Sequence, residues 1–147
     1  MKKIDNKKAH FQYEIGDTIE AGIVLLGDEI KALRAGKVSL AGSFGRVLFN
    51  EKGTPELWLV GAHIGSSTLD PTRSRKLLVH KNEIKKLIGA TQEKGLTLVP
   101  TKIYFKKGRA KIALSQAKGK NIYDKRQTIK KRDIEREIKQ RTKFNIK

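Results

Sequence analysis

The sequence predicts a mainly β domain, a small antiparallel barrel of about six strands with flanking helices. Short runs of alternating apolar and polar residues recur along the first 117 residues, and turn signals separate them. Only two segments show helical spacing. A parallel sheet would need a helix between nearly every pair of strands, and those helices are missing. The length of 147 residues suits one domain with a single core.

Six segments alternate in the manner of short strands. They cover residues 11–15, 18–26, 43–49, 56–64, 96–105 and 110–115. Gly16 and Asp17 are predicted to turn the first strand into the second, and residues 50–55 are predicted to form a hairpin loop. Residues 106–109 turn the last pair, and Pro100 implies an edge or a bulge in its strand.

Apolar residues at i, i+4 and i+7 from Leu26 to Leu33 predict a helix of about two turns, which Asp28 caps and Gly36 ends. Residues 81–93 form the second predicted helix, because an apolar stripe runs along them and a glycine follows their end.

Two residues in apolar runs are expected in the core. Trp58, the only tryptophan, lies in the run Leu-Trp-Leu-Val and is interpreted as core rather than as a platform for stacking bases. Leu78 also has the pattern of a core residue. The alternation around Glu20 places its carboxylate on the polar face of its strand. Residues 2–10 are interpreted as a basic entry segment.

The chain is predicted to divide into residues 1–116, the barrel with its helices, and residues 117–147, a basic tail. The net charge is +18, and residues 118–147 hold twelve basic and four acidic residues. The tail lacks the apolar residues that would fix one helical face, and isolated helices of this length are marginal in water. We therefore predict that the tail is disordered alone and helical when bound.

Charge of this size disfavours a compact chain unless a polyanion neutralises it. Basic residues recur in the entry segment, the first helix, residues 73–76, residues 106–111 and the tail. One such run would be a solvated surface, but five favour a surface that follows phosphates. Nucleic acid or the ribosome is the predicted partner. Heparin-like polymers and acidic membranes are the alternatives.

The residues contain no pattern of an active site, so we predict no enzyme, no cofactor and no metal. The three histidines, His10, His63 and His80, lack the spacing of a zinc helix. The absence of cysteine excludes disulfides and thiolate sites. The N-terminus lacks the apolar core of a signal peptide, and no apolar run reaches membrane-spanning length. A soluble, cytoplasmic protein is predicted.

Several stretches between residues 6 and 126, in the correct order, resemble the SmpB family. They are residues 6–10, 20–25, 27–38, 57–60, 70–78, 93–100, 104–106 and the block AKGK-x-x-YDKR at 117–126. No single stretch would carry the resemblance, but their shared order leaves little room for coincidence. The loop between His63 and Asp70 is several residues shorter than in that family.

The resemblance implies an oligonucleotide-binding-type barrel that grips the tRNA-like domain of tmRNA. It implies delivery of tmRNA to stalled ribosomes, with the tail in the decoding centre and the empty mRNA channel, where small-subunit rRNA is the partner. A monomer is expected. The alternative is a ribosomal or general single-strand RNA-binding protein with a basic arm.

The resemblance also assigns RNA-contact positions, which are His10, Glu20, Leu78 and Lys111. The basic runs add the further RNA-binding candidates Lys31, Arg34, Lys106, Lys118 and Lys120. The tail residues expected at the decoding centre or in the channel are Tyr123, Asp124, Lys125, Arg126, Lys130, Lys131, Arg132 and Arg136. Glu20 can only accept hydrogen bonds, from a base edge or a 2′-OH. Its alternative role is to pair with a nearby Lys or Arg.

Overall fold

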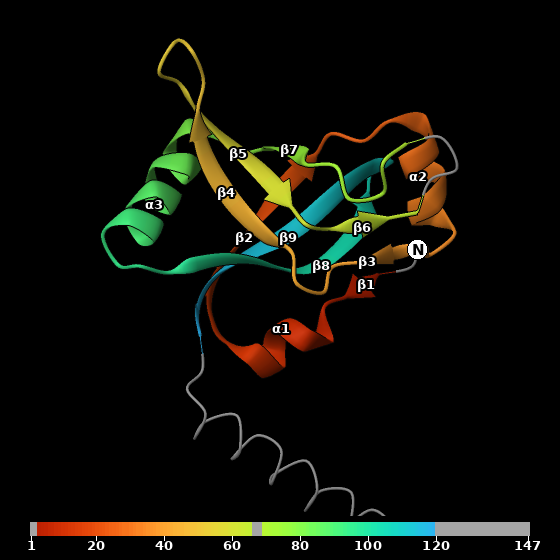
Figure 1. Cartoon of the computed structure of the whole chain (residues 1–147), viewed down its shortest axis with the longest axis horizontal. Coiled ribbons are helices and arrows are strands. Elements are labelled where there is room, and N and C mark those ends of the chain that lie inside the picture. The colour runs from red at the N-terminus through yellow and green to blue at the C-terminus, as the bar shows by residue number, and fades with distance from the viewer. Residues whose placement is uncertain (1–2, 66–68, 120–147) are drawn as a thin grey trace, which may run out of the picture.

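Six antiparallel strands close into a ring in this computed structural model, which describes residues 3–65 and 69–119 (Figure 1). The strands follow the order β8-β4-β5-β7-β2-β9 around the ring, and β9 pairs back with β8. Their bounds are Tyr13–Ile23 for β2, Phe44–Phe49 for β4, Pro55–Val60 for β5, Arg75–Leu78 for β7, Thr97–Lys106 for β8 and Arg109–Gly119 for β9. The predicted barrel is confirmed.

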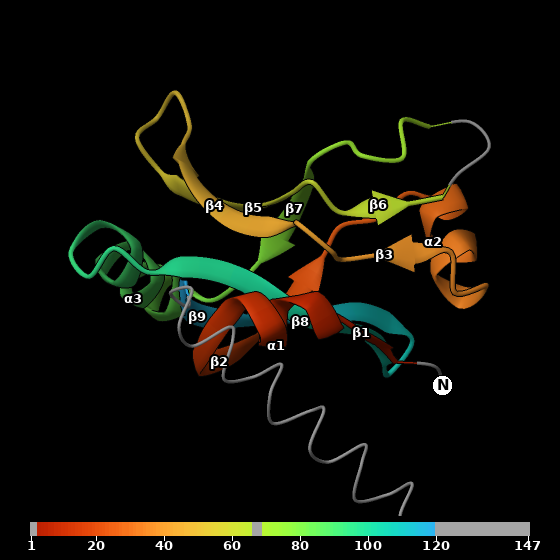
Figure 2. The ribbon, with the colours of Figure 1, turned by 60° about the horizontal axis from the view of Figure 1, so that its bottom comes forward.

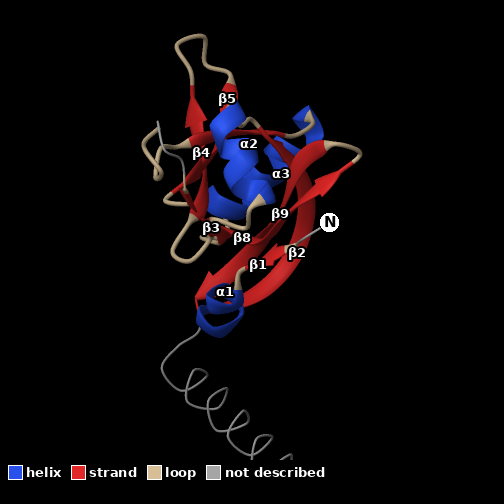
Figure 3. Cartoon of the chain, turned by 90° about the vertical axis from the view of Figure 1, so that its right-hand side faces the viewer, coloured by secondary structure: helices blue, strands red, loops and turns tan. Residues whose placement is uncertain are grey.

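Three helices and three short strands flank the ring. These elements are α1 (Lys7–Gln12), α2 (Gly27–Arg34), α3 (Lys81–Gln92), β1 (Ile4–Asp5), β3 (Val38–Ser39) and β6 (His63–Ile64). β1 extends the sheet beside β8, and β3 pairs with β6. The helices α2 and α3 lie at opposite ends of the barrel, and α1 lies against its side (Figure 2). Seen from the α2 end, the strands outline the barrel around α2 and α3 in projection (Figure 3).

The core fills the ring with side chains from its strands. The most completely buried of its large apolar residues from the ring are Leu57, Leu59, Leu98, Ile103, Ile112 and Leu114. The helix α2 adds Leu33 and α3 adds Leu87, and each such side chain contributes about 1.5–3 kcal/mol by leaving water. β4 approaches β8 closely at Gly45, where an added Cβ would lie 3.1 Å from the Cβ of Leu98. A side chain at this position would therefore force Leu98 or Leu114 to move by a few tenths of an ångström.

The predicted turn at Gly16 and Asp17 is wrong, because β2 is one continuous strand. The register of β2 against β9 shifts between Ile15 and Thr18, so this segment is a bulge. The bulge adds a residue and bends the strand without ending it. Pro100 also lies at a shift in register, between β8 and β9, which confirms the bulge predicted there.

The entry segment contains a helix that the sequence analysis missed. Residues 7–12 form α1, although residues 11–15 were predicted as a strand. The side chain of Asn6 accepts a hydrogen bond from the Ala9 N–H at 3.3 Å and caps this helix. Its Nδ2 donates to the carbonyl oxygen of Pro100 at 2.8 Å, which fixes α1 against β8.

Residues 56–64 were predicted as one strand but form two. Gly61 adopts φ +83°, and the chain leaves the ring there, so β6 pairs with β3 instead.

The core prediction for Trp58 is also wrong. Trp58 is half-buried, whereas Leu57 and Leu59 on either side of it are buried. Successive side chains of a strand point to opposite faces, which places Trp58 on the outer face of β5.

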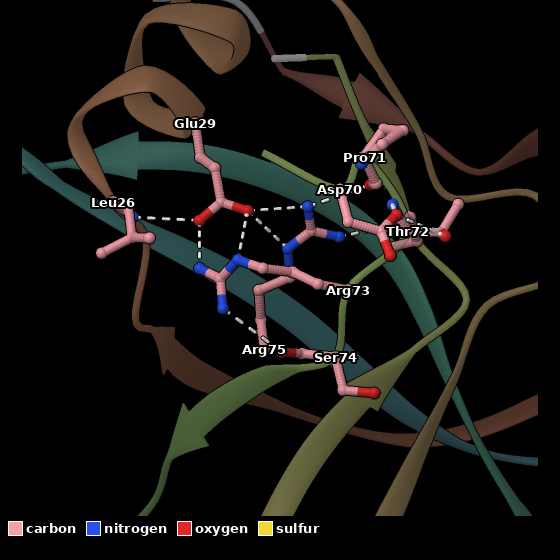
Figure 4. A network of polar contacts seen from close by, with 9 residues as sticks. Leu26, Glu29, Asp70, Pro71, Thr72, Arg73, Ser74 and Arg75 are labelled. Atoms are coloured by element: carbon pink, nitrogen blue, oxygen red, sulfur yellow. Dashed lines mark hydrogen bonds and ion pairs between the residues drawn. The ribbon is translucent and has the colours of Figure 1, made fainter. Parts of the chain in front are cut away.

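A buried ion-pair network holds α2 against β7 (Figure 4). Glu29 of α2 is completely buried, and its Oε2 accepts hydrogen bonds from Arg75 Nε at 2.8 Å and from Arg73 Nε at 3.0 Å. Arg73 Nη2 also donates to Oε1. Arg75, itself fully buried, donates to the carbonyl oxygens of Ala62 and Pro71 at 2.7 and 3.0 Å. One carboxylate therefore joins three segments of the chain.

The same carboxylate replaces the predicted cap of α2. The helix begins at Gly27 with Leu26 as its N-cap residue, and Glu29 Oε1 accepts the Leu26 N–H at 3.0 Å. The prediction that Asp28 caps this helix is therefore wrong, although Asp28 lies in its first turn. Burial would raise the pKa of Glu29, but hydrogen bonds from Arg73, from the Leu26 N–H and from Arg75 outweigh it and lower the pKa.

The division into residues 1–116 and 117–147 stays a prediction. Strand β9 continues through Ala117 to Gly119. Residues 120–147 lie outside the described part of the chain, and so does the predicted change of their conformation on binding.

Candidate nucleic-acid interface

Four neighbouring strands place polar and apolar side chains in one row. Gly22 of β2 pairs with Leu78 of β7 on one side and with Lys111 of β9 on the other. Lys111 pairs in turn with Tyr104 of β8. Residues opposite one another in adjacent strands share a face of the sheet. The side chains of Leu78, Lys111 and Tyr104 therefore lie on one face, with Gly22 between Leu78 and Lys111. The core prediction for Leu78 is wrong, since 54% of this residue is exposed.

Glu20 lies two residues before Gly22 and therefore faces the same side of the sheet. The Tyr104 hydroxyl donates a hydrogen bond to Glu20 Oε2, and Lys106 Nζ lies 3.4 Å from Oε1. The predicted pairing of Glu20 with a nearby lysine is thus present. The carboxylate keeps 37% of its side chain exposed, so it can accept a further hydrogen bond from outside the protein.

The contacts of this group favour the ionised form of Glu20. The hydrogen bond from Tyr104 lowers the pKa of Glu20, desolvation opposes it, and the charges of Lys106 and Lys111 lower the pKa further. Burial and the Glu20 carboxylate together raise the pKa of Tyr104 to about 12. At neutral pH the pair is a phenol donor and a carboxylate acceptor, and the carboxylate can only accept hydrogen bonds.

A pocket of about 640 Å³ opens at this row. Glu20, Leu78 and Lys111 all line it, so the fold brings three of the four RNA-contact positions implied by resemblance into one cavity. Phe105 and Arg109 line it too, which adds an aromatic ring and another cation. The apolar walls of the pocket suit the flat base of a nucleotide, and its two cations, Arg109 and Lys111, suit an anionic phosphate, although Glu20 and Glu83 also line it.

The two candidates on α2 do not line this pocket, but each lies next to a residue that does. The guanidinium of Arg34 lies 5.6 Å from the centre of the Phe105 ring, in a cation–π contact that holds it near the cavity. Lys31 is exposed on the same helix. Ile30, one residue earlier, lines the pocket directly.

His10 and Lys118 lie away from the pocket, since neither lines it. His10 is exposed in the last turn of α1, and Lys118 is exposed near the end of β9. Lys118 pairs with Glu14, and α1 packs against this end of β2. The predicted contacts on the described residues therefore form two groups, one at the pocket and one near α1.

The remaining candidates lie outside the described residues. These are Lys120, Tyr123, Asp124, Lys125, Arg126, Lys130, Lys131, Arg132 and Arg136. Their predicted contacts with RNA stay predictions.

Sequence reasoning missed the role of Tyr104 beside Glu20. The signal was present in the alternation of Lys102, Tyr104 and Lys106, which places the phenol on the same face as two lysines. The sequence does not show that β8 pairs with β9 and β9 with β2. These pairings bring Tyr104 next to Glu20, although the two residues are 84 positions apart in the sequence.

Within residues 3–65 and 69–119, no cluster of three or more His, Asp or Glu side chains is arranged to hold a metal ion. The helices of that part of the chain include none long and apolar enough to cross a membrane.

The closed ring and the net charge of +18 define a basic β-barrel protein of the oligonucleotide-binding type. The sequence model of the family described as "SmpB protein" matches residues 3–144. The SsrA-binding protein of Thermosynechococcus vestitus is 49% identical, over 93% of this chain and 94% of its own length. The SsrA-binding protein of Acetivibrio thermocellus is 51% identical, over 97% of this chain and 93% of its own. The chain therefore belongs to the SmpB protein family.

A solved structure gives the same result for the fold. A chain from the work described as "tmRNA-SmpB: a journey to the center of the bacterial ribosome" superposes with a TM-score of 0.66. The two chains are 45% identical, and the match covers 86% of this chain and 94% of the other.

Proposed function

We propose that this protein binds the tRNA-like domain of tmRNA and delivers it to stalled ribosomes in trans-translation. The observation that carries the proposal is the gathering of Glu20, Leu78 and Lys111 into one pocket. Membership of the SmpB family and the relatives named SsrA-binding protein support the choice of RNA. The solved structure described as a tmRNA–SmpB ribosome assembly supports the ribosome as second partner.

Each pocket residue suits one part of an RNA. The Glu20 carboxylate accepts a hydrogen bond from a base edge or from a 2′-OH, the group that distinguishes RNA from DNA. The Lys111 ammonium neutralises phosphate. The exposed Leu78 side chain and the Phe105 ring give apolar surface to an unstacked base. Together these contacts favour a looped, single-stranded segment over a regular duplex.

The other basic groups extend the contact. His10 and Lys118 are proposed to touch the same RNA from the α1 side, and Lys31 and Arg34 from α2. Residues from 120 onward are proposed to act in the decoding centre and the mRNA channel, where they meet phosphate of small-subunit rRNA. This work requires no cofactor and no chemical step by the protein, which acts as a monomer in the cytoplasm, where ribosomes are found.

A competition experiment tests this proposal. The isolated tRNA-like domain of tmRNA competes with bulk tRNA of equal length for the purified protein, and we expect a clear preference for the tRNA-like domain. Lys111→Ala is expected to cost about 1–3 kcal/mol of that binding, because it removes a charged contact. Equal affinities of the wild-type protein for both RNAs would favour a general RNA-binding protein instead.

A further inference from the structure

A second groove lies beside the RNA pocket, between the β4–β5 hairpin, β7 and α3. It has a volume of about 350 Å³. The hairpin projects beside α3 in two views of the molecule (Figures 1 and 2). Leu57, Leu77 and Ile84 line the groove, and all three are buried residues of the core. Its walls are therefore mainly apolar, a surface suited to a flat, weakly polar group.

Lysines from two elements surround this apolar interior. Lys76 of β7 and Lys81 and Lys85 of α3 all line the groove. Lys76 Nζ lies 2.8 Å from Glu56 Oε2, the one carboxylate among the lining residues. Lys81 and Lys85 are exposed and form no ion pair with another described residue. The groove therefore carries a net positive charge and is complementary to an anion with an apolar part.

The groove is continuous with the RNA pocket. Leu78 and Val79 line both cavities, and the exposed Leu78 side chain stands between them. An RNA strand that contacts Leu78 from the Glu20 side would therefore pass next to the groove, because the two cavities share these two lining residues.

We propose that this groove takes one unpaired nucleotide of the same RNA, with its base against the apolar walls and its phosphates beside Lys81 and Lys85. The proposal rests on the proposed function. The apolar walls select for a base without reading its edge, because stacking and apolar contacts tolerate every base. The α3 lysines supply the sequence-independent attraction to phosphate. The RNA interface thus extends past Leu78 onto α3.

The chain offers a closely matched pair of variants for a test. Lys85 and Lys86 are both exposed on α3, but only Lys85 lines the groove. Lys85→Ala and Lys86→Ala remove the same charge from adjacent positions of one helix. We expect Lys85→Ala to weaken binding of the tRNA-like domain of tmRNA about five- to tenfold and to lower the salt dependence by about one phosphate contact. Lys86→Ala should change the affinity less than twofold.

Lys85→Arg provides a further control, because it keeps the charge and should keep most of the affinity. Equal losses from Lys85→Ala and Lys86→Ala would overturn the proposal, since only long-range electrostatics would then connect α3 to the RNA. If the wild-type protein shows no preference for the tRNA-like domain over bulk tRNA, the proposed function fails and the groove assignment fails with it. If the wild-type protein prefers the tRNA-like domain but Lys85→Ala and Lys86→Ala bind it with equal affinity, the groove assignment fails and the proposed function stands.

A cross-linking experiment gives an independent readout. The chain has no cysteine, so Thr54→Cys creates a single attachment point for a photoreactive group at the groove. Lys86→Cys carries the same group outside the groove. We expect the Thr54 probe to cross-link to one or two adjacent nucleotides of the tRNA-like domain and the Lys86 probe to give weak, scattered products. Indistinguishable patterns from the two probes would contradict an RNA-binding groove.

Discussion

The Glu20–Tyr104 pair is the most informative feature at the scale of single residues. A carboxylate on an RNA-binding surface repels phosphate, so its presence needs a specific use. The Tyr104 hydroxyl and Lys106 orient the carboxylate, and the hydrogen bond and the nearby lysines keep its pKa low. In the proposed RNA site, the Glu20 carboxylate would serve as a fixed acceptor for a base edge or a ribose hydroxyl. The charge of Lys111 acts on Glu20, and in the proposed site this lysine would attract the phosphate that Glu20 repels.

The pKa of Tyr104 responds to this pairing as well as to burial. Its folded value of about 12 lies above the ordinary value of 10, because of burial first and the Glu20 carboxylate second. The contribution of the pair to stability is therefore fully present below pH 10 and is lost as the pH rises through about 12. In Glu20→Gln we expect the Tyr104 pKa to fall toward 10 but to remain above it, since burial is unchanged.

Ultraviolet titration at the absorbance band of tyrosinate, with Tyr104→Phe as the blank, follows this one phenol. An unchanged Tyr104 pKa in Glu20→Gln would mean that the two side chains do not interact in solution.

At the scale of elements, α2 depends on one buried carboxylate. Glu29 joins the helix to residues 73–75 and, through Arg75, to the carbonyl oxygens of Ala62 and Pro71. The side chains Lys31 and Arg34 lie on the same short helix, so the network also fixes their position beside the pocket. Removing one member of a buried ion pair leaves the other charge unpaired, which costs more than the pair contributes.

Glu29→Gln should therefore lower the free energy of unfolding by about 3–5 kcal/mol at neutral pH. The folded pKa of Glu29 lies below its ordinary value of 4.5, so its stabilisation is present above pH 4.5 and is lost as the pH falls through the folded pKa. Urea denaturation from pH 7 to pH 3 should show a steeper loss in the wild-type protein than in Glu29→Gln.

Glu83→Gln is the matched control. Glu83 also accepts a backbone N–H at a helix start, that of His80 at 3.0 Å, but it has no arginine partner among the described residues. Similar losses from both substitutions would show that helix capping, rather than the arginine pair, explains the effect.

The elements differ in how far local sequence determines them. The stripe and flanking glycine of residues 81–93 suffice to predict α3, because its amphipathic pattern is local. The helix α1 has one local signal, its N-cap residue Asn6, but its position depends on hydrogen bonds from Asn6 to β8, which no local pattern predicts. In the run around Trp58 every residue is apolar, so the sequence pattern does not show which side chains face the core. The pairing of β5 with β4 and β7 in the closed ring determines which ones do. The exposure of Leu78 has the same origin.

At the scale of the whole molecule, charge is distributed between a barrel and a basic C-terminal segment. The ring ends with β9 at Gly119, and its strands, the helices and their loops supply the described lining of both cavities. The C-terminal residues from 118 onward hold twelve of the 33 basic residues of the chain. Binding of tmRNA and action on the ribosome are therefore expected to depend on different parts of the protein.

Truncation after Gly119 tests this division. The shortened protein keeps every ring strand and both cavities, so its affinity for the tRNA-like domain of tmRNA should stay within a few-fold of the full chain. The small loss expected reflects weaker long-range attraction between a less basic protein and RNA. Tagging of nascent chains on stalled ribosomes should disappear, because the residues proposed for the decoding centre and the mRNA channel are gone.

Full-length Lys86→Ala serves as the control for a modest loss of charge, and nascent chains should still be tagged with this variant. If the truncated protein fails to bind the tRNA-like domain while its barrel remains folded by circular dichroism, residues beyond 119 belong to the RNA-binding site, and the two-part division is wrong.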